Sequence, residues 1–159
     1  MDPYEALRPE AATPQDELCT CEGRPPIVLQ DHLSPNPISC LKCNLEIPPE
    51  RLGITSELAR GIAYWRNLQR AFDMLWLDSR DYEDWARPQL EDPNGRIAVM
   101  GLKLVDALNN YVRAYYWWFE DASVDDFVPL SQCPRCGGSL DQQFVCFVCE
   151  KCSIVVHRD

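Results

Sequence analysis

Residues 133–152 read CPRCGGSLDQQFVCFVCEKC and contain five cysteines, one more than a single tetrahedral metal ion needs. The stretch begins and ends with a C-x2-C pair. In a zinc knuckle, both sulfurs of such a pair bind one ion, and backbone N–H groups beyond the turn can donate to the thiolates. Each pair precedes a short strand-like run, GGSL or SIVV. We therefore predict a zinc ribbon whose ligands are Cys133, Cys136, Cys149 and Cys152.

Cys146 is the fifth cysteine of this stretch. It could pair with Cys149 and leave Cys152 over, but only the Cys149/Cys152 choice repeats the order of knuckle and then strand. A reactive thiol at Cys146 would have no histidine or helix N-terminus nearby in the sequence to activate it. We expect Cys146 to be a small buried residue on a strand.

A second group of cysteines lies near the N-terminus, where Cys19-Thr-Cys21 is followed after 18 residues by Cys40-Leu-Lys-Cys43. One half is a C-x2-C knuckle, and C-x-C is a less usual partner for it. We predict a second zinc site with these four ligands, with His32 in place of Cys19 or Cys21 as the alternative. Iron in a rubredoxin-like centre is the other metal that such pairs can hold.

The sequence between the two cysteine groups has helical periodicity. Apolar residues from Leu58 to Trp76 recur at spacings of three and four, with Thr55 or Ser56 as the N-cap. RDYEDWAR predicts a short helix ended by Pro88, and a second long apolar stripe runs from Ile97 to Trp118. We predict an α+β fold: a central antiparallel helical core of two long helices and one short one, with a C-terminal zinc ribbon and an N-terminal zinc knuckle module.

The same patterns divide the chain into four parts. Residues 1–18 are acidic and proline-rich, which predicts a disordered tail. Residues 19–53 form the N-terminal zinc-binding segment, residues 54–128 the helical core, and residues 129–159 the zinc ribbon, which is too small to fold without metal.

The densest aromatic stretch is Tyr115-Tyr116-Trp117-Trp118-Phe119. Five successive helical residues point all round the helix axis, so one partner helix cannot cover them all. Either this end of the helix is buried on every side, or part of it is an exposed platform that grips a partner protein or stacks bases. For the second case the candidate interaction surface consists of Tyr116, Trp117, Phe119, Arg66, Arg70 and Arg113.

Charge and composition narrow the classes of partner and compartment. A net charge of −10 and a pI near 4.6 disfavour binding to nucleic acid or to anionic membranes. Residues 131–159 carry three basic and three acidic side chains, so the ribbon itself is not basic. The sequence has no apolar run of about 18 residues, so it predicts no membrane-spanning helix. The N-terminus does not resemble a signal peptide. With an odd count of nine cysteines, we expect a cytoplasmic protein whose reduced thiols hold metal.

Four segments together carry a family resemblance: CLKCNLEIPPERL, IAYWRNLQRAFDMLWLDSRDYE, AYYWWF and CPRCGGSL…CEKCSIVV. Their order resembles an uncharacterised bacterial family that is usually described as zinc-ribbon-containing and as a candidate nucleic-acid binder. The likeness runs over about residues 40–156. It implies zinc ligation by the four ribbon cysteines and by Cys40 and Cys43, but it does not extend to Cys19 and Cys21.

The motifs do not predict an enzyme. Four thiolates fill a tetrahedral zinc and leave no position for substrate, and the sequence contains no P-loop, G-x-G-x-x-G or G-x-S-x-G motif. We expect a non-enzymatic interaction protein (an adaptor, regulator or inhibitor/immunity-like partner) that binds another, basic protein. The alternatives are a nucleic-acid-binding zinc ribbon, and a thiol redox or metal sensor that uses Cys19/Cys21 or Cys146. The sequence leaves the oligomeric state open.

Overall fold

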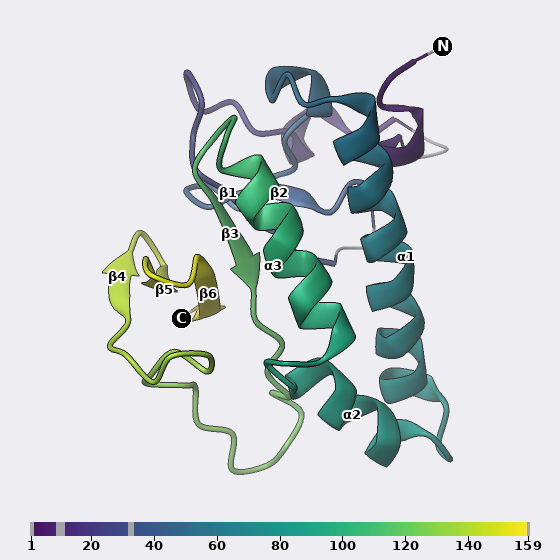
Figure 1. Ribbon diagram of the computed structural model, residues 1–159, viewed down its shortest axis with the longest axis vertical. Helices are drawn as coiled ribbons and strands as arrows, with labels where there is room; N and C mark the ends of the chain where they lie inside the picture. The colour runs from purple at the N-terminus through teal and green to yellow at the C-terminus, as the bar shows by residue number, and fades with distance from the viewer. Residues whose placement is uncertain (1, 9–11, 32–33, 159) are drawn as a thin grey trace.

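Six strands form one curled sheet in the order β2-β1-β3-β6-β5-β4. The computed structural model describes residues 2–8, 12–31 and 34–158, and Figure 1 shows the sheet beside three α-helices. The strands are β1 Ile27–Leu29, β2 Ile38–Cys40, β3 Ala114–Trp117, β4 Asp141–Gln143, β5 Cys146–Cys149 and β6 Ile154–Arg158. The helices are α1 Ser56–Asp78, α2 Glu83–Glu91 and α3 Arg96–Leu108, with 3-10 turns at Glu5–Leu7, Gln15–Glu17 and Pro49–Arg51.

Strand β3 joins the N-terminal and C-terminal parts of the chain. It pairs in parallel with β1 on one side and with β6 on the other, whereas the β1–β2, β4–β5 and β5–β6 pairs are antiparallel. Tyr116 has a partner on both sides, Leu29 in β1 and Ile154 in β6. The two cysteine-containing segments therefore belong to one continuous sheet.

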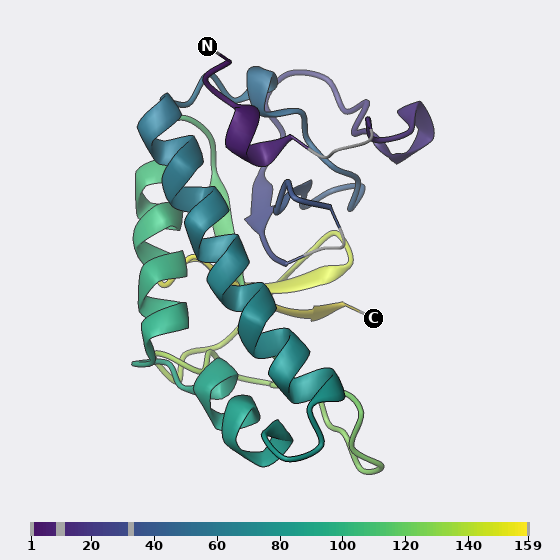
Figure 2. The ribbon, with the colours of Figure 1, turned by 90° about the vertical axis from the view of Figure 1, so that its right-hand side faces the viewer.

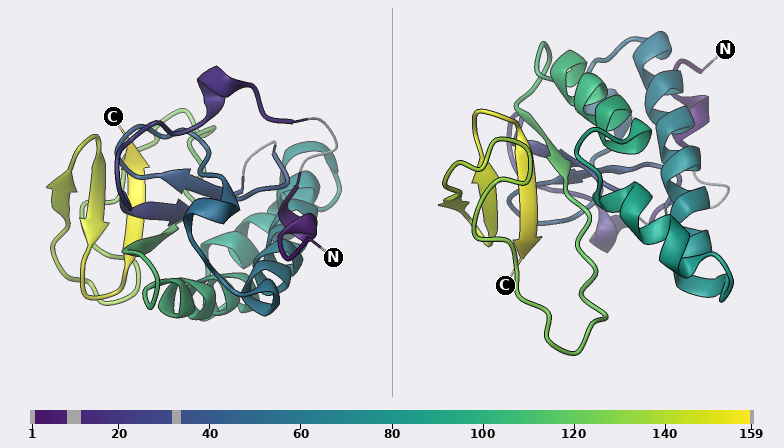
Figure 3. Two further views of the ribbon diagram at one scale, coloured as in Figure 1. Left: turned by 90° about the horizontal axis from the view of Figure 1, so that it is seen from above. Right: turned by 60° about the horizontal axis from the view of Figure 1, so that its bottom comes forward.

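The helices lie along one face of this sheet, as the view from above in Figure 3 shows. Helix α1 begins where predicted, because the Thr55 side chain accepts a hydrogen bond from the Leu58 backbone N–H at 3.2 Å. Its buried face starts with Ile62 and Trp65 and continues with the polar Gln69. In the second half of the helix Phe72 and Trp76 of the predicted stripe are half-buried, whereas the most deeply buried positions, Gln69 and Asp73, are polar.

The second long helix is shorter than predicted, and the expectation that it continues to Trp118 is wrong. Helix α3 ends at Leu108, and residues 114–117 form β3. Asn109 makes the change of direction: its Nδ2 donates to the Val105 carbonyl at 2.9 Å, and its Oδ1 accepts from the Ala114 N–H at 3.0 Å. Aromatic residues also favour a strand over a helix.

The strand conformation solves the packing problem of the aromatic stretch. Side chains alternate between the two faces of a strand, so Tyr116 and Trp118 join the core between sheet and helices. Tyr115 and Trp117 join a smaller cluster on the other face. Gly101 of α3 lies directly against Tyr116, where an added Cβ would come 2.2 Å from the tyrosine Cε2.

The described part of the predicted tail makes specific contacts. Leu7 is 1% exposed, and the Tyr4 hydroxyl donates to the Ile54 carbonyl at 3.2 Å. Figure 2 shows this N-terminal turn beside the first half of α1. None of the helices among the described residues has the length and apolar character needed to cross a membrane.

Candidate metal centres and adjoining hollows

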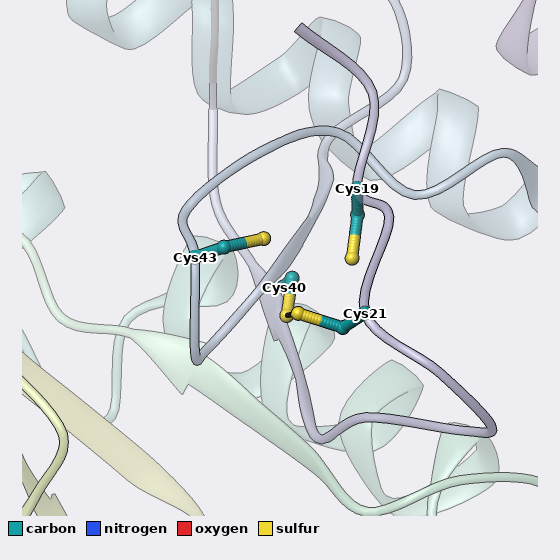
Figure 4. Close-up of side chains that lie close together, drawn as sticks. All are labelled: Cys19, Cys21, Cys40 and Cys43. Carbon is teal, nitrogen blue, oxygen red and sulfur yellow. Dashed lines mark hydrogen bonds between the residues drawn. The ribbon is translucent and has the colours of Figure 1, made fainter. Parts of the chain in front are cut away.

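The first group of four cysteines lies at the edge strand β2. Cys19 and Cys21 come from the segment that precedes β1, Cys40 ends β2, and Cys43 lies in the turn after it. Figure 4 shows the four side chains pointing toward one another, and their sulfur atoms all lie within 4.8 Å of one another. A tetrahedral ion with Zn–S bonds of about 2.3 Å separates its sulfurs by about 3.8 Å; the Cys21–Cys40 distance is 4.0 Å. These four thiols could hold one metal ion.

Arg51 positions the less usual C-x-C half of this group. Its guanidinium donates to the backbone carbonyls of Cys19 and Cys21, each at 2.5 Å, and to that of Gly23 at 3.2 Å. Sequence reasoning missed this residue, because nothing in the spacing of Arg51 from the cysteines indicates the contact. His32, the alternative ligand, lies outside the described residues.

The second group consists of Cys133, Cys136, Cys149 and Cys152, whose sulfur atoms also lie within 4.8 Å of one another. The sulfurs of Cys136 and Cys149 are 3.7 Å apart, close to the tetrahedral separation. Cys149 ends β5, and Cys152 lies in the turn to β6. The right-hand view of Figure 3 shows this hairpin beside the long loop that follows β3.

All three C-x2-C turns have the same backbone geometry. The residue four positions after the first cysteine has a left-handed conformation in each: Asn44 at φ 61°, Gly137 at φ 66° and Ser153 at φ 51°. In two of them this residue donates its N–H to the carbonyl of the first cysteine, at 2.9 Å for Asn44 and 2.8 Å for Gly137. The pairs Cys40/Cys43, Cys133/Cys136 and Cys149/Cys152 therefore share one local feature, a left-handed residue directly after the second cysteine.

Individual cysteines of these groups differ in the pKa of their thiols. Burial raises the pKa of Cys40 and of Cys152 to about 12. At the exposed Cys136, the Gly138 N–H lowers the pKa to about 7. Because a coordinated thiol is deprotonated by its metal, the cation would convert all four to thiolates and release protons as it binds.

Cys146 takes no part in either group. It is 0% exposed and packs on the second face of the sheet with Val28, Tyr115 and Val155. Its position on β5 agrees with the expectation of a small buried residue. Such burial also argues against a reactive thiol.

The predicted interaction residues do not form one surface. Tyr116 is 2% exposed, so its assignment to a contact surface is wrong: it packs between Trp65 and Trp118. Arg113 lies over the Tyr115 ring, 4.6 Å from its centroid, and pairs with Glu150 in the C-terminal hairpin.

The remaining interaction residues meet at a hollow beside α1. Arg70, Trp117 and Phe119 line it, and its volume is about 290 Å³. Arg66 and Arg70 both pair with Asp31, at 3.4 and 3.3 Å. Gln69 and Asp73 also line this hollow and were missed in the sequence, although both fall on the buried face of a helix where apolar residues are expected.

Two further hollows adjoin this one. One, of about 390 Å³, lies between α2 and the segment after β3 and has apolar walls that include Phe127 and Val128. The other, of about 360 Å³, lies between the ends of α1 and α2. Each pair of hollows shares a lining residue: Phe119 lines the first and second, Trp76 the first and third, and Arg87 the second and third. Together they make a recessed surface with both aromatic and acidic lining residues.

Carboxylates greatly outnumber basic groups on this surface. Arg70 and Arg87 are the basic side chains that line the three hollows within the described residues. The acidic ones are Asp31, Asp73, Glu83, Asp84, Glu91, Glu120, Asp121 and Asp126.

Comparisons with known proteins add no relative. No protein-family model matches the chain, and no curated protein or solved structure does. What the structure establishes is a mixed α and β protein with two groups of four cysteines, each able to hold a metal ion.

Proposed function

We propose that this chain is a non-enzymatic, zinc-stabilised interaction protein that binds a basic partner protein. The observation that carries the proposal is the recessed surface beside α1 and α2, where aromatic and apolar walls combine with many carboxylates and two guanidinium groups. Burying apolar walls gives affinity, and complementary charge selects and steers the partner.

Zinc suits the two cysteine groups best. Four thiolates at near-tetrahedral separations are the ligand set of structural zinc sites. We assign the C-terminal group to a zinc ribbon, because two knuckles have left-handed residues at equivalent positions, one before β4 and the other between β5 and β6. The sites have a structural role, since a tetrahedral ion with four thiolate ligands leaves no position for substrate. Membership of the bacterial zinc-ribbon family and a cytoplasmic location, where thiols stay reduced, belong to the same proposal.

Charge disfavours the nucleic-acid alternative. Phosphate recognition needs a surplus of Lys and Arg at the contact surface, but the chain has a net charge of −10. Arg66, Arg70 and Arg113, the basic residues of the candidate interaction surface, are each paired with a carboxylate. Binding to nucleic acid is therefore the result that would contradict the proposal.

The test compares partner capture by three forms of the tagged, zinc-loaded protein in extracts of the source organism. The first is the wild type. The second, Asp84→Asn/Glu91→Gln/Asp126→Asn, neutralises three exposed carboxylates that line the hollows. The third, Glu22→Gln/Asp106→Asn/Asp141→Asn, is the matched control, because it removes as many exposed carboxylates from outside the hollows.

We expect the wild type and the control to capture the same basic protein, and the variant of the hollows to lose it. Calorimetry with the purified partner should then show binding that weakens at least tenfold in that variant. The proposal fails if neutralising the hollows leaves capture unchanged. It also fails if the protein instead binds labelled DNA or RNA with a steep salt dependence near 0.15 M ionic strength.

A further inference from the structure

The hollow of about 290 Å³ beside α1 has polar groups that the fold itself does not require. Gln69 and Asp73 occupy the positions after Trp65 on the buried face of α1, and they are 7% and 9% exposed. The Gln69 Nε2 donates to both carboxylate oxygens of Asp73, at 3.2 and 3.3 Å. An apolar pair at these positions would pack the helix at lower cost, since burying polar groups is unfavourable unless their hydrogen bonds are made.

Gln69 and Asp31 each have an acceptor oxygen in this hollow that receives no hydrogen bond from the described residues. Within the described residues, the Gln69 Oε1 is buried and accepts no hydrogen bond. Leaving a buried acceptor without a donor is unfavourable, so this atom points to a donor supplied from outside. The Oδ1 of Asp31 also accepts no hydrogen bond there, although it lies 3.4 Å from the Arg66 Nε. The hollow thus offers mainly acceptors.

The walls of the hollow are aromatic. Trp65, Trp76, Trp117 and Phe119 line it, and Trp76 meets Phe119 edge to face with centroids 4.8 Å apart. Ligand pockets for drug-sized molecules occupy about 300–1,000 Å³, so this hollow is at the small end and suits a single side chain. Indole and phenyl faces attract cations.

The charged side chains around the hollow favour a positively charged ligand. Arg66 and Arg70 pair with Asp31 and offset its charge. The charged side chains that line the hollow within the described residues are the acidic Asp31, Asp73 and Glu120 and the basic Arg70.

We propose that this hollow binds one arginine side chain, presented by the basic partner protein. The inference rests on the proposed function, because it names the group of the partner that the surface recognises. A guanidinium carries five N–H donors and no acceptor, and its flat face stacks on aromatic rings. It can donate to the Gln69 Oε1 and to the Asp73 carboxylate while it lies against Trp76 or Phe119. A nucleobase would also need donors from the site, but the Gln69 amide N–H groups are directed to Asp73 and the Arg70 guanidinium pairs with Asp31.

The ionisation of Asp73 provides an independent signature. Burial, and next the hydrogen bond with Asp31, raise the pKa of Asp73 to about 7. Asp31 and Tyr116 face this carboxyl from the sheet side and Arg70 faces it from α1. A guanidinium favours the carboxylate form, so binding should displace a proton below pH 7 and weaken as the pH falls.

The test is a titration of the ¹⁵N-labelled, zinc-loaded protein with N-acetyl-arginine amide, followed by the tryptophan indole and glutamine amide resonances. We expect saturable shifts of the indole signals of Trp76 and Trp117, with a Kd of about 1–10 mM for one isolated side chain. N-acetyl-citrulline amide has nearly the same shape without the charge and should bind at least tenfold more weakly. Asp73→Asn and Gln69→Leu should weaken the arginine probe by a similar factor, whereas the exposed Asp106→Asn serves as the matched control and should not.

Equal binding of arginine and citrulline would overturn the inference, as would no saturable shift with arginine or an equal loss in Asp106→Asn. Saturable binding of adenosine or guanosine in place of arginine would also overturn it. The two proposals fail separately. The arginine probe could fail to bind while the Asp84/Glu91/Asp126 variant still loses capture of the partner. In that case the proposed interaction function is retained, and only the assignment of an arginine to this hollow is wrong.

Discussion

Replacing Gly101 by alanine tests how closely α3 lies against the aromatic strand. In the interior of a helix, Gly→Ala ordinarily stabilises a protein by about 1 kcal/mol. Here the added Cβ would lie 2.2 and 2.6 Å from two ring carbons of Tyr116 and 3.0 Å from the Trp65 Nε1. These separations are far inside van der Waals contact, so either the ring or the helix must shift.

Neither neighbour can yield easily. Tyr116 is 2% exposed and lies between Trp65 and Trp118, with ring centroids 6.0 and 6.1 Å away. The Trp65 indole N–H donates to the Ile97 carbonyl of α3 at 3.2 Å, so moving the helix also strains a buried hydrogen bond worth about 1 kcal/mol. Overpacking a core costs about 1–3 kcal/mol. After subtracting the gain in helix propensity, we expect Gly101→Ala to destabilise the protein by about 2 kcal/mol.

Gly61→Ala is the matched control within α1. Its Cβ would meet only the Leu104 Cδ2, at 3.3 Å, which is the end of a flexible side chain. We expect this variant to be neutral or up to about 1 kcal/mol more stable than the wild type. Denaturant unfolding of the zinc-loaded proteins, followed by tryptophan fluorescence, measures both changes as shifts in midpoint at constant slope. If Gly101→Ala proves as stable as Gly61→Ala, then α3 does not pack on Tyr116 as described.

Three other predictions concern the metal centres and Asp73. Metal analysis should give two zinc ions per chain in the wild type and in Cys146→Ser, but one in Cys136→Ser; two ions in the last variant would contradict the ligand assignment. Arg51→Met removes the donors that hold the C-x-C backbone, so a chelator should extract one of the two ions severalfold faster than from the wild type; equal rates for both ions would refute the positioning role. The pKa of Asp73, about 7 when folded against 3.8 as its ordinary value, means that the folded state binds this proton more tightly. The free energy of unfolding of the wild type should therefore fall as the pH rises through that interval. Relative to the wild type, Asp73→Asn should become more stable by on the order of 2 kcal/mol between pH 5.5 and 8. Parallel pH profiles of the two proteins would contradict this.

The cysteine groups could be predicted because their geometry is local. A C-x2-C turn brings its two sulfurs together by itself, so spacing alone suggested the same two groups of four that the structure brings together. Cys146 could be set aside for the same reason, since no knuckle followed by a strand includes it.

The aromatic strand could not be predicted because its pattern is ambiguous. Tyr111, Tyr115 and Trp118 fit a spacing of three and four, but Tyr116 and Trp118 also fit the alternation of a strand. The hydrogen bonds of Asn109 decide between these patterns, and they depend on residues that follow it. The hollow beside α1 was missed for a different reason: Asp31 reaches Arg70 across 39 positions of the sequence, and only the folded chain brings them together.

The pairing of β3 with both β1 and β6 has a consequence for folding during synthesis. When Ala114–Trp117 leaves the ribosome, β1 is already available, but β6 is still to be made. Until residue 158 emerges, one edge of β3 stays open, and exposed edges of aromatic strands invite pairing with other chains. Metal binding by the C-terminal cysteines would join the two sides of the turn between β5 and β6 and so help to supply the missing neighbour. With zinc as the proposed metal, we expect less of the newly made protein to aggregate when zinc is available.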